Sequence, residues 1–402
     1  MTTASRHVVR GRLVTPERVL PDGVLAIEGE LISWVGDARE WGDADGWPPA
    51  VDVGGTLLPG LVDVHCHGAA GSGFPDADPA GAEAAAAHHR AHGTTSLLAS
   101  LVTAPEPDLI AALDVCAGLV EAGDAAGIHL EGPFLARARA GAQDSAAIRD
   151  PDLRLLDRLL DAGRGHVRTL TYAPELPGAA RLAARAVERG VVPCIGHTDC
   201  DARTARAALT AAAESALGRA AATHLFNGMP VLHSRAPGPV AAALAAAARG
   251  EAVVELVADG VHLAPDTVAA VFDLVGPRQI ALVTDAMSAA GMPAGSYRLG
   301  RLDVEVSAGV ARLAGAGPPE SRSIAGGTAR LVDVLRRTVR DAGVELPAAV
   351  TAATATPARL LGLEGITGAL QPGLRADLLV VDAELHPVRV MSAGRWTHGA
   401  PA

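Results

Sequence analysis

Two histidines separated by a single residue are the first groups in this chain whose spacing indicates chemistry. Residues 59–68 read Pro-Gly-Leu-Val-Asp-Val-His-Cys-His-Gly, an apolar run that ends in a histidine pair before glycine-rich sequence. Short apolar runs bounded by Pro and Gly are typical of buried strands. Residues i and i+2 of a strand share a face, so His65 and His67 can point at one spot while Cys66 packs on the other side. Alone, the pair fits either a divalent-metal site or two ordinary polar residues at a strand end.

Other strand-like runs also end in groups that bind metals or move protons. These endings are Glu131 before a Gly-Pro pair, His197 in Ile-Gly-His-Thr, His224 in Ala-Thr-His-Leu-Phe-Asn, His262 in Ala-Asp-Gly-Val-His, and Asp285 in Val-Thr-Asp-Ala. One such residue is usually structural, but five on successive strands are hard to obtain by chance. We therefore predict that they share one metal site.

The residue types suggest which side chains bind metal and which transfer protons. Zn²⁺, the metal we expect, takes imidazole nitrogen and carboxylate oxygen, and a catalytic site leaves a position open for water. Glu131, His197 and His224 form one plausible set of three ligands. Glu131 could also bridge to a second ion held by His65, His67 and Asp285, so one or two ions are expected. Asp285 could take a proton from water and return it to a leaving amine.

The surrounding sequence predicts an α/β architecture that would bring these endings together. From residue 59 onward, apolar runs alternate with Ala-, Leu- and Arg-rich helical segments, the pattern of parallel βα units. About eight strands are expected, ending at 65 and near 95–100, and then covering 127–131, 167–172, 191–197, 222–224, 252–258 and 279–285. Eight such units make a (β/α)8 TIM barrel, whose active site lies at the carboxyl ends of the strands. Residues 297–313 are expected to form a β-hairpin insertion.

Both ends of the chain have the sequence pattern of short strands. Residues 7–58 alternate apolar and polar positions between Gly, Pro and Asp turns, and residues 368–396 return to the same pattern. We expect the two ends to pair in a small β-sandwich domain made of residues 1–58 and 359–402, with the barrel at 59–358.

Composition excludes several classes of function. The net charge of −11 over 402 residues argues against a nucleic acid or an anionic membrane as partner, because both require a basic face. The chain contains no lysine, which excludes a Schiff-base lysine, a pyridoxal-phosphate lysine and a carbamylated-lysine metal bridge. The first residues lack an apolar signal core, the four cysteines form no CxxC pair, and no apolar run of about 18 residues occurs. We expect a cytoplasmic protein.

Six motifs, in this order, resemble the N-acetylglucosamine-6-phosphate deacetylases of the amidohydrolase superfamily. They are Pro-Gly-Leu-Val-Asp-Val-His-Cys-His-Gly from 59, His-Leu-Glu-Gly-Pro-Phe from 129, Gly-His-Thr from 196, Thr-His-Leu-Phe-Asn-Gly-Met from 223, Asp-Gly-Val-His from 259 and Thr-Asp-Ala from 284. The resemblance covers nearly the whole chain. It implies that Glu131, His197 and His224 are the principal metal ligands and that Asp285 is the catalytic acid and base.

The resemblance also implies a set of substrate contacts for a small phosphosugar. Asn227 and Gly228 match contacts to the sugar phosphate, and His262, with Asp259 nearby, matches a position that hydrogen-bonds the substrate and could assist catalysis. Arg235 resembles a phosphate-binding arginine that can serve a neighbouring subunit, because the family's active site lies near a homodimer interface. The loops that touch the sugar correspond to Ala142, Ile324, Ala325 and Gly326.

Two features bear on how far the resemblance extends. Gln143 stands where many relatives have histidine, which can change how the sugar is held. The pair His65 and His67 is intact, whereas some relatives lack it and use one metal, so the number of ions stays open. Two histidines outside the motifs, His88 and His89, are expected to face solvent.

The predicted reaction is hydrolysis of the acetamide of N-acetylglucosamine 6-phosphate to glucosamine 6-phosphate and acetate. The nearest alternative keeps the chemistry and changes the substrate to N-acetylgalactosamine 6-phosphate or another N-acyl amino sugar. A cyclic-amide hydrolase commonly needs the bridging lysine that is missing here. A non-catalytic homologue would be expected to lose ligands, and this chain keeps them all.

Overall fold

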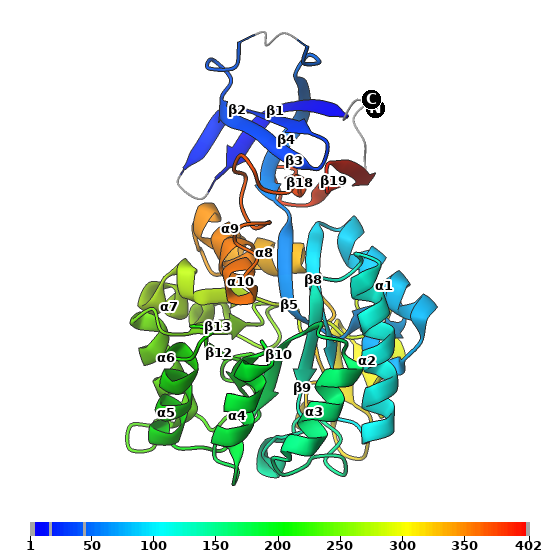
Figure 1. Ribbon diagram of the computed structural model, residues 1–402, viewed down its shortest axis with the longest axis vertical. Coiled ribbons are helices and arrows are strands. Elements are labelled where there is room, and N and C mark those ends of the chain that lie inside the picture. Colours follow the sequence, from blue (N-terminus) through cyan, green and yellow to red (C-terminus); the bar gives the residue numbers. More distant parts are fainter. Residues whose placement is uncertain (1–4, 16–17, 43–45, 399–402) are drawn as a thin grey trace.

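The barrel is the larger of two sheet assemblies in the computed structural model, which describes residues 5–15, 18–42 and 46–398. Eight parallel strands follow one another around it in chain order, each hydrogen-bonded to the next. They are β5 (Leu61–Cys66), β8 (Thr94–Leu101), β9 (Gly127–Glu131), β10 (Val167–Tyr172), β11 (Val192–Ile195), β12 (Ala221–Ala222), β13 (Val253–Leu256) and β14 (Ile280–Leu282). All eight predicted strands are present, and the predicted barrel is confirmed (Figure 1).

Helices cover the outside of the barrel because each presents one apolar face to the strands. In α3 the buried residues are Leu155, Leu156, Leu159 and Leu160, a helical spacing, and the Asp152 side chain caps the first turn. The barrel strands are buried on both faces, since side chains fill the interior and helices cover the exterior. The helices are α1 (Pro79–Ala91), α2 (Glu106–Glu121), α3 (Leu153–Ala162), α4 (Ala179–Glu188), α5 (Ala202–Ala213), α6 (Gly238–Ala248), α7 (Pro265–Val275), α8 (Leu331–Arg340), α9 (Leu346–Ala353) and α10 (Ala355–Leu361).

The seam between the last and first barrel strands is closed by residues that extend beyond β14. The amide of Asp285 donates to the carbonyl of His65 (2.9 Å), and the amide of His67 donates to the carbonyl of Ala286 (2.7 Å). Beneath them the buried Asp63 carboxylate accepts hydrogen bonds from the amide (3.3 Å) and hydroxyl (2.6 Å) of Thr284. The seam therefore joins the two strand ends that carry the histidine pair and the predicted proton carrier.

The two ends of the chain pair in a second, mostly antiparallel sheet, as predicted. Its order is β20-β19-β18-β4-β1-β2-β3, in which only β1 and β4 run parallel. The strands are β1 (Arg6–Val14), β2 (Val19–Glu28), β3 (Leu31–Asp37), β4 (Val51–Pro59), β18 (Leu378–Val381), β19 (Pro387–Ser392) and β20 (Arg395–His398). The sheet encloses its own apolar core, which includes Leu25, Leu57 and Leu378.

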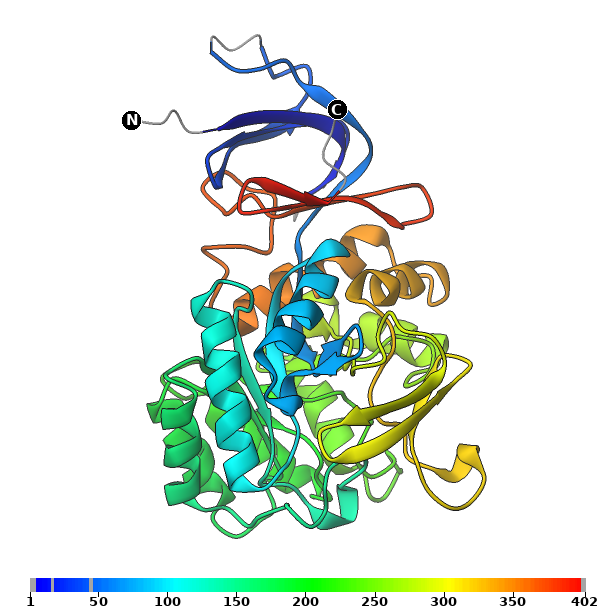
Figure 2. The ribbon, with the colours of Figure 1, turned by 90° about the vertical axis from the view of Figure 1, so that its right-hand side faces the viewer.

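Strand β4 leads directly into β5, so the barrel strands run away from the end sheet and their carboxyl ends lie on the opposite side of the molecule (Figures 1 and 2). The domain limits at 58/59 and 358/359 stay predictions. Residues 1–4, 16–17, 43–45 and 399–402 of the predicted small domain lie outside the described residues. No helix among the described residues is long and apolar enough to cross a membrane.

The insertion after the eighth strand holds one strand more than the predicted hairpin. β15 (Gly295–Leu299), β16 (Leu302–Ser307) and β17 (Val310–Leu313) form a three-stranded antiparallel sheet beside the barrel mouth (Figure 2). The extra strand arises because the apolar residues of all three pack on one small core with Val102 and Met287. The remaining short elements are β6 (Gly68–Ala69), β7 (Ser72–Gly73), η1 (Phe74–Asp76), η2 (Arg137–Arg139), η3 (Pro277–Gln279) and η4 (Pro319–Ser321).

The prediction that His88 and His89 face solvent is wrong for His89. Its side chain is fully buried, with Nε2 3.2 Å from both the Cys66 thiol and the carbonyl of Gly68. α1 packs this face against β6 and β7, whose existence the helix's own alanine-rich sequence could not reveal. Burial, with smaller contributions from nearby charges, lowers the pKa of His89 to about 4, so the ring is neutral.

Candidate active site

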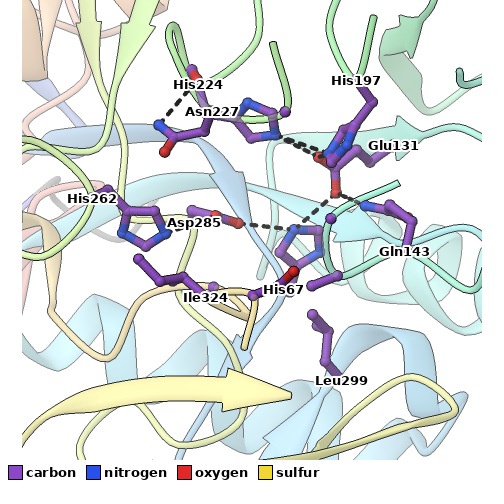
Figure 3. Close-up of a pocket in the computed structure, with 15 residues that line it drawn as sticks. His67, Glu131, Gln143, His197, His224, Asn227, His262, Asp285, Leu299 and Ile324 are labelled. Atoms are coloured by element: carbon purple, nitrogen blue, oxygen red, sulfur yellow. Dashed lines mark hydrogen bonds and ion pairs between the residues drawn. The ribbon is translucent and has the colours of Figure 1, made fainter. Parts of the chain in front are cut away.

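A cavity of about 250 Å³ opens at the carboxyl ends of the barrel strands. Figure 3 shows imidazole and carboxylate groups along one side and apolar residues from the insertion along the other. The lining residues are His67, Glu131, Gly141, Ala142, Gln143, His197, His224, Asn227, Gly228, His262, Asp285, Leu299, Ser323, Ile324 and Gly326. Most of the residues that the sequence analysis selected therefore meet in one place.

Glu131, His197 and His224 form a buried group whose ligand atoms could hold one metal ion. Glu131 Oε1 lies 2.9 Å from Nε2 of His197 and 2.9 Å from Nε2 of His224. The two imidazole nitrogens are themselves 3.1 Å apart. Each residue stands at or just beyond the end of its own strand, β9, β11 or β12, and the barrel closes these ends into a ring.

His65, His67 and Asp285 form a second such group. The Nε2 atoms of the two histidines are 3.1 Å apart, and Asp285 Oδ1 lies 3.4 Å from Nε2 of His65 and 3.2 Å from Nε2 of His67. Both histidines point inward and Cys66 is buried on the other side, as the alternation of a strand predicts.

Glu131 connects the two groups. While Oε1 faces His197 and His224, Oε2 lies 3.4 Å from Nε2 of His67. Nε2 of His65 lies 3.8 Å from Oε1. One carboxylate whose two oxygens approach histidines of both groups has the arrangement that a bridging ligand requires.

The remaining ring nitrogens show that these imidazoles fit a metal. Nδ1 of His67 faces the carbonyl of Ser100 (3.1 Å), and Nδ1 of His197 faces the carbonyl of Arg139 (2.7 Å). A carbonyl only accepts, so each Nδ1 carries a proton, and once the ring is neutral, as metal binding requires, the Nε2 lone pair faces the centre. Fixed tautomers of this kind are typical of metal-binding histidines. The donor set of imidazoles and carboxylates suits a divalent ion such as Zn²⁺.

Three residues at the site hold the left-handed backbone conformation that favours glycine. The φ angles are 45° for His197, 29° for His224 and 48° for Asp285. Such conformations in non-glycine residues cost on the order of 1 kcal/mol or more and cluster at functional sites. Here they turn the chain sharply at the end of a strand and direct the side chain over the barrel mouth.

His262 and Asp259 lie next to Asp285. Nδ1 of His262 is 2.9 Å from Oδ2 of Asp259, and Nε2 is 3.7 Å from Oδ2 of Asp285. Burial opposes a charge on His262, but the hydrogen bond and charge of Asp259 outweigh it and raise the pKa of the imidazole. His262 can therefore present an N–H to a bound carbonyl oxygen.

Three of the predicted substrate contacts do not line the cavity. Asp259 lies behind His262 and orients it through their hydrogen bond. Ala325 is buried in the core of the insertion. Arg235 is exposed on the segment that follows Asn227, beyond the lining of the cavity.

The sequence analysis missed residues that only the fold brings to the site. Leu299 and Ser323 line the cavity from the insertion and its return, and no motif marks them. Beneath the site, the buried Glu255 contacts His65 and His224. A signal for Glu255 was present, because it is the only charge in the apolar run Ala-Val-Val-Glu-Leu-Val-Ala at 252–258.

Gln143 holds the carboxylate of Glu131 in place. Its Oε1 accepts a hydrogen bond from the amide of Thr103 (2.7 Å), and its Nε2 donates to Oε2 of Glu131 (2.5 Å). We predict that Gln143→Ala weakens metal binding about 10- to 100-fold, because outer hydrogen-bond partners tune ligands by that amount. Competition with a chromophoric chelator measures this effect. Gln279→Ala is the control, because Gln279 directly precedes β14 and so lies at the opposite end of the barrel from the site. Unchanged affinity would contradict the prediction.

Comparison with known proteins places this barrel and its site in a recognised class. Residues 56–397 match the model of the amidohydrolase family. The chain belongs to the amidohydrolase family and is a hydrolase acting on an amide.

The similar proteins point to a narrower group. A solved structure of a mutant N-acetyl-D-glucosamine-6-phosphate deacetylase from Mycobacterium smegmatis, in complex with N-acetyl-D-glucosamine-6-phosphate, is 40% identical with a TM-score of 0.88, covering 98% of this chain and 99% of that chain. An N-acetylgalactosamine-6-phosphate deacetylase from Escherichia coli O157:H7 is 33% identical over 398 residues, 97% of this chain and 98% of its own. The human N-acetylglucosamine-6-phosphate deacetylase is 33% identical over 365 residues, 87% of this chain and 86% of its own.

Proposed function

We propose that this protein removes the acetyl group of N-acetylglucosamine 6-phosphate, giving glucosamine 6-phosphate and acetate. The observation that carries the proposal is the convergence of Glu131, His197 and His224 beside Asp285 and His262, in a cavity large enough for part of a sugar. The relative of 40% identity that binds this phosphosugar supports the choice of substrate.

The proposed mechanism assigns each group one task. Glu131, His197 and His224 would hold a divalent ion. When bound, that ion would polarise the amide carbonyl and lower the pKa of a water toward about 7. Asp285 takes the proton of the attacking water and delivers it to the nitrogen of the breaking C–N bond, so that the amine leaves neutral. His262, held by Asp259, donates a hydrogen bond to the carbonyl oxygen as negative charge develops there.

We assign the sugar to the loops around the cavity. Asn227 and Gly228 contact the sugar phosphate, while Ala142, Gln143, Ile324 and Gly326 contact the ring. Leu299 and Ile324 form an apolar wall opposite the ligands, which suits the methyl group of an acetamide.

The proposed cofactor is Zn²⁺, in one or two ions per subunit. The two three-residue groups joined by Glu131 support two ions. A cytoplasmic location is also proposed, since all four cysteines are free and buried, as expected for a protein of a reducing compartment.

A homodimer completes the proposed site. Arg235 is exposed on the same segment as Val231 and Leu232, residues that are 87% and 47% exposed. Exposed apolar residues of this kind mark contact surfaces. We propose that this segment packs on a second subunit and that Arg235 there grips the substrate phosphate with its forked guanidinium.

Arg235→Ala is therefore expected to raise KM for the phosphorylated sugar about 10- to 100-fold with little change in kcat. The estimate follows from the 1.5–3 kcal/mol typical of a hydrogen bond to a charged group. Initial rates over a range of substrate concentration measure it, with Arg181→Ala on the exposed face of α4 as the control. An unchanged KM would remove Arg235 from the phosphate site.

The experiment that tests the function is acetate release from N-acetylglucosamine 6-phosphate and from its galacto epimer. The purified protein is assayed before chelation, after chelation and after metal is added back. Metal-dependent release that is faster with the gluco epimer supports the proposal. No release from either sugar by metal-loaded protein would overturn it.

One observation favours the galacto epimer as a second candidate. The E. coli relative, 98% of which is covered by the match to this chain, is named N-acetylgalactosamine-6-phosphate deacetylase. A galacto preference in the same assay would keep the mechanism and change the substrate.

A further inference from the structure

Glu255 is a buried carboxylate that lies outside the six motifs. It lies on β13 with only 2% of its surface exposed. Its Oε2 is 3.0 Å from Nδ1 of His65 and accepts a hydrogen bond from the amide of His224 (3.1 Å). A buried carboxylate is costly unless it is paired, so its place beneath both ligand groups requires an explanation.

The partner of His65 differs in kind from the partners of the other histidines that are candidate metal ligands. His67 and His197 give their Nδ1 protons to neutral backbone carbonyls. For His224 Nδ1, no hydrogen-bond partner occurs among the described residues. Among the four histidines that are candidate ligands, only His65 has an anion behind it. A carboxylate that accepts the Nδ1 proton fixes the tautomer and makes Nε2 a stronger donor.

The charge balance of the site also favours a role for Glu255 in metal binding. Two divalent ions would bring four positive charges into a buried site, whereas Glu131 and Asp285 bring two negative ones. The carboxylate of Glu255 adds a third without occupying a ligand position. The carboxylate of Glu255 should strengthen ion binding most at the group of His65, His67 and Asp285. It contacts the ring of His65 in that group, whereas at His224 it contacts only the backbone amide.

We propose that Glu255 is a positioning residue that acts through His65 to make the group of His65, His67 and Asp285 bind its own divalent ion. The inference rests on the proposed metal dependence and extends it, since it names the residue that determines whether a second ion is held. It does not depend on which sugar is the substrate.

Metal titration of chelator-treated protein tests the proposal. Zn²⁺ is added in competition with a chromophoric chelator, and Co²⁺ titrations follow the d–d absorption of each site. Glu255→Gln can keep an oxygen at the position of Oε2, with both hydrogen bonds, and loses only the charge. Glu255→Leu loses charge and hydrogen bonds together. Glu251→Gln, a half-exposed residue paired with Arg249, is the control.

The unaltered protein is expected to bind two equivalents. In Glu255→Gln the second equivalent is expected to weaken about 10- to 100-fold while the first is unchanged, and Glu255→Leu is expected to weaken the second further. Melting of the metal-free variants checks that they fold. Loss of the second Co²⁺ band with the first retained distinguishes positioning of His65 from a general structural role.

Three results would overturn the proposal. They are a single equivalent bound by the unaltered protein, unchanged affinity for the second equivalent in both variants, and equal weakening of both equivalents in Glu255→Gln. The titrations contain no sugar, so they stand even if the protein hydrolyses neither phosphosugar. Failure of the proposed function and failure of this inference are therefore separate outcomes.

Discussion

Asp285→Asn is expected to lower kcat on the order of 10³-fold or more with a much smaller change in KM. General acid–base groups contribute about 10²- to 10⁴-fold, and here the same carboxylate would both take the proton of water and deliver it to the amine. Asparagine keeps the size and polarity of the side chain but cannot accept a proton. The amide can still occupy the space near His65 and His67, so substrate should still bind.

Metal content must be measured in the same preparation, because Asp285 is also a candidate ligand. Lost activity with as many ions bound as in the unaltered protein assigns proton transfer to Asp285. Asp273→Asn, on the exposed part of α7, is the matched control and should behave as the unaltered protein. A variant at position 285 that keeps more than a tenth of the activity would contradict the assignment.

Metal-free protein is expected to be less stable at pH 9.5 than at pH 6, by on the order of 3 kcal/mol. Burial opposes a charge on His67, but hydrogen bonds to Asp285 and Glu131 outweigh it and raise the pKa of His67 to about 9. The ordinary value is 6.5. A raised pKa in the folded state gives stability that is fully present below pH 6.5 and is lost as the pH rises through about 9.

Urea unfolding of chelator-treated protein at the two pH values measures this loss. Metal-loaded protein should lose less over the same range, because a bound ion replaces the proton as the positive partner of the carboxylates. His67→Gln, which has no titrating ring, is the control and should show a smaller difference between the two pH values. Greater stability of the metal-free protein at pH 9.5 would show that the imidazole is not charged in the folded state.

Most of the barrel and most of the ligand set could be predicted because both follow from local regularities. A strand alternates its faces over two residues, so the spacing of His65 and His67 already places both on one side. A parallel strand in a βα unit ends at the same edge as its neighbours, so Glu131, His197 and Asp285 could be expected together.

The residues that were predicted wrongly or missed are positioned by contacts between segments far apart in the chain. His89 lies on a helix whose own sequence gives no sign that β6 and β7 cover it. Leu299 reaches the cavity from β15 of the insertion, whose apolar residues pack on Val102 and Met287. Gln143 was assigned to the sugar from the resemblance, and the structure adds that both ends of its amide contact the protein.

The sequence by itself determined the class of chemistry, because residue types fix which atoms can bind a metal or carry a proton, and the absence of lysine fixes what cannot bridge two ions. The tertiary structure decided how these atoms face one another. Closure of the barrel sets Glu131 between two histidine groups and places Glu255 behind His65. Distances of about 3 Å between residues far apart in the chain arise only when all eight strands are in register, and no local pattern encodes them.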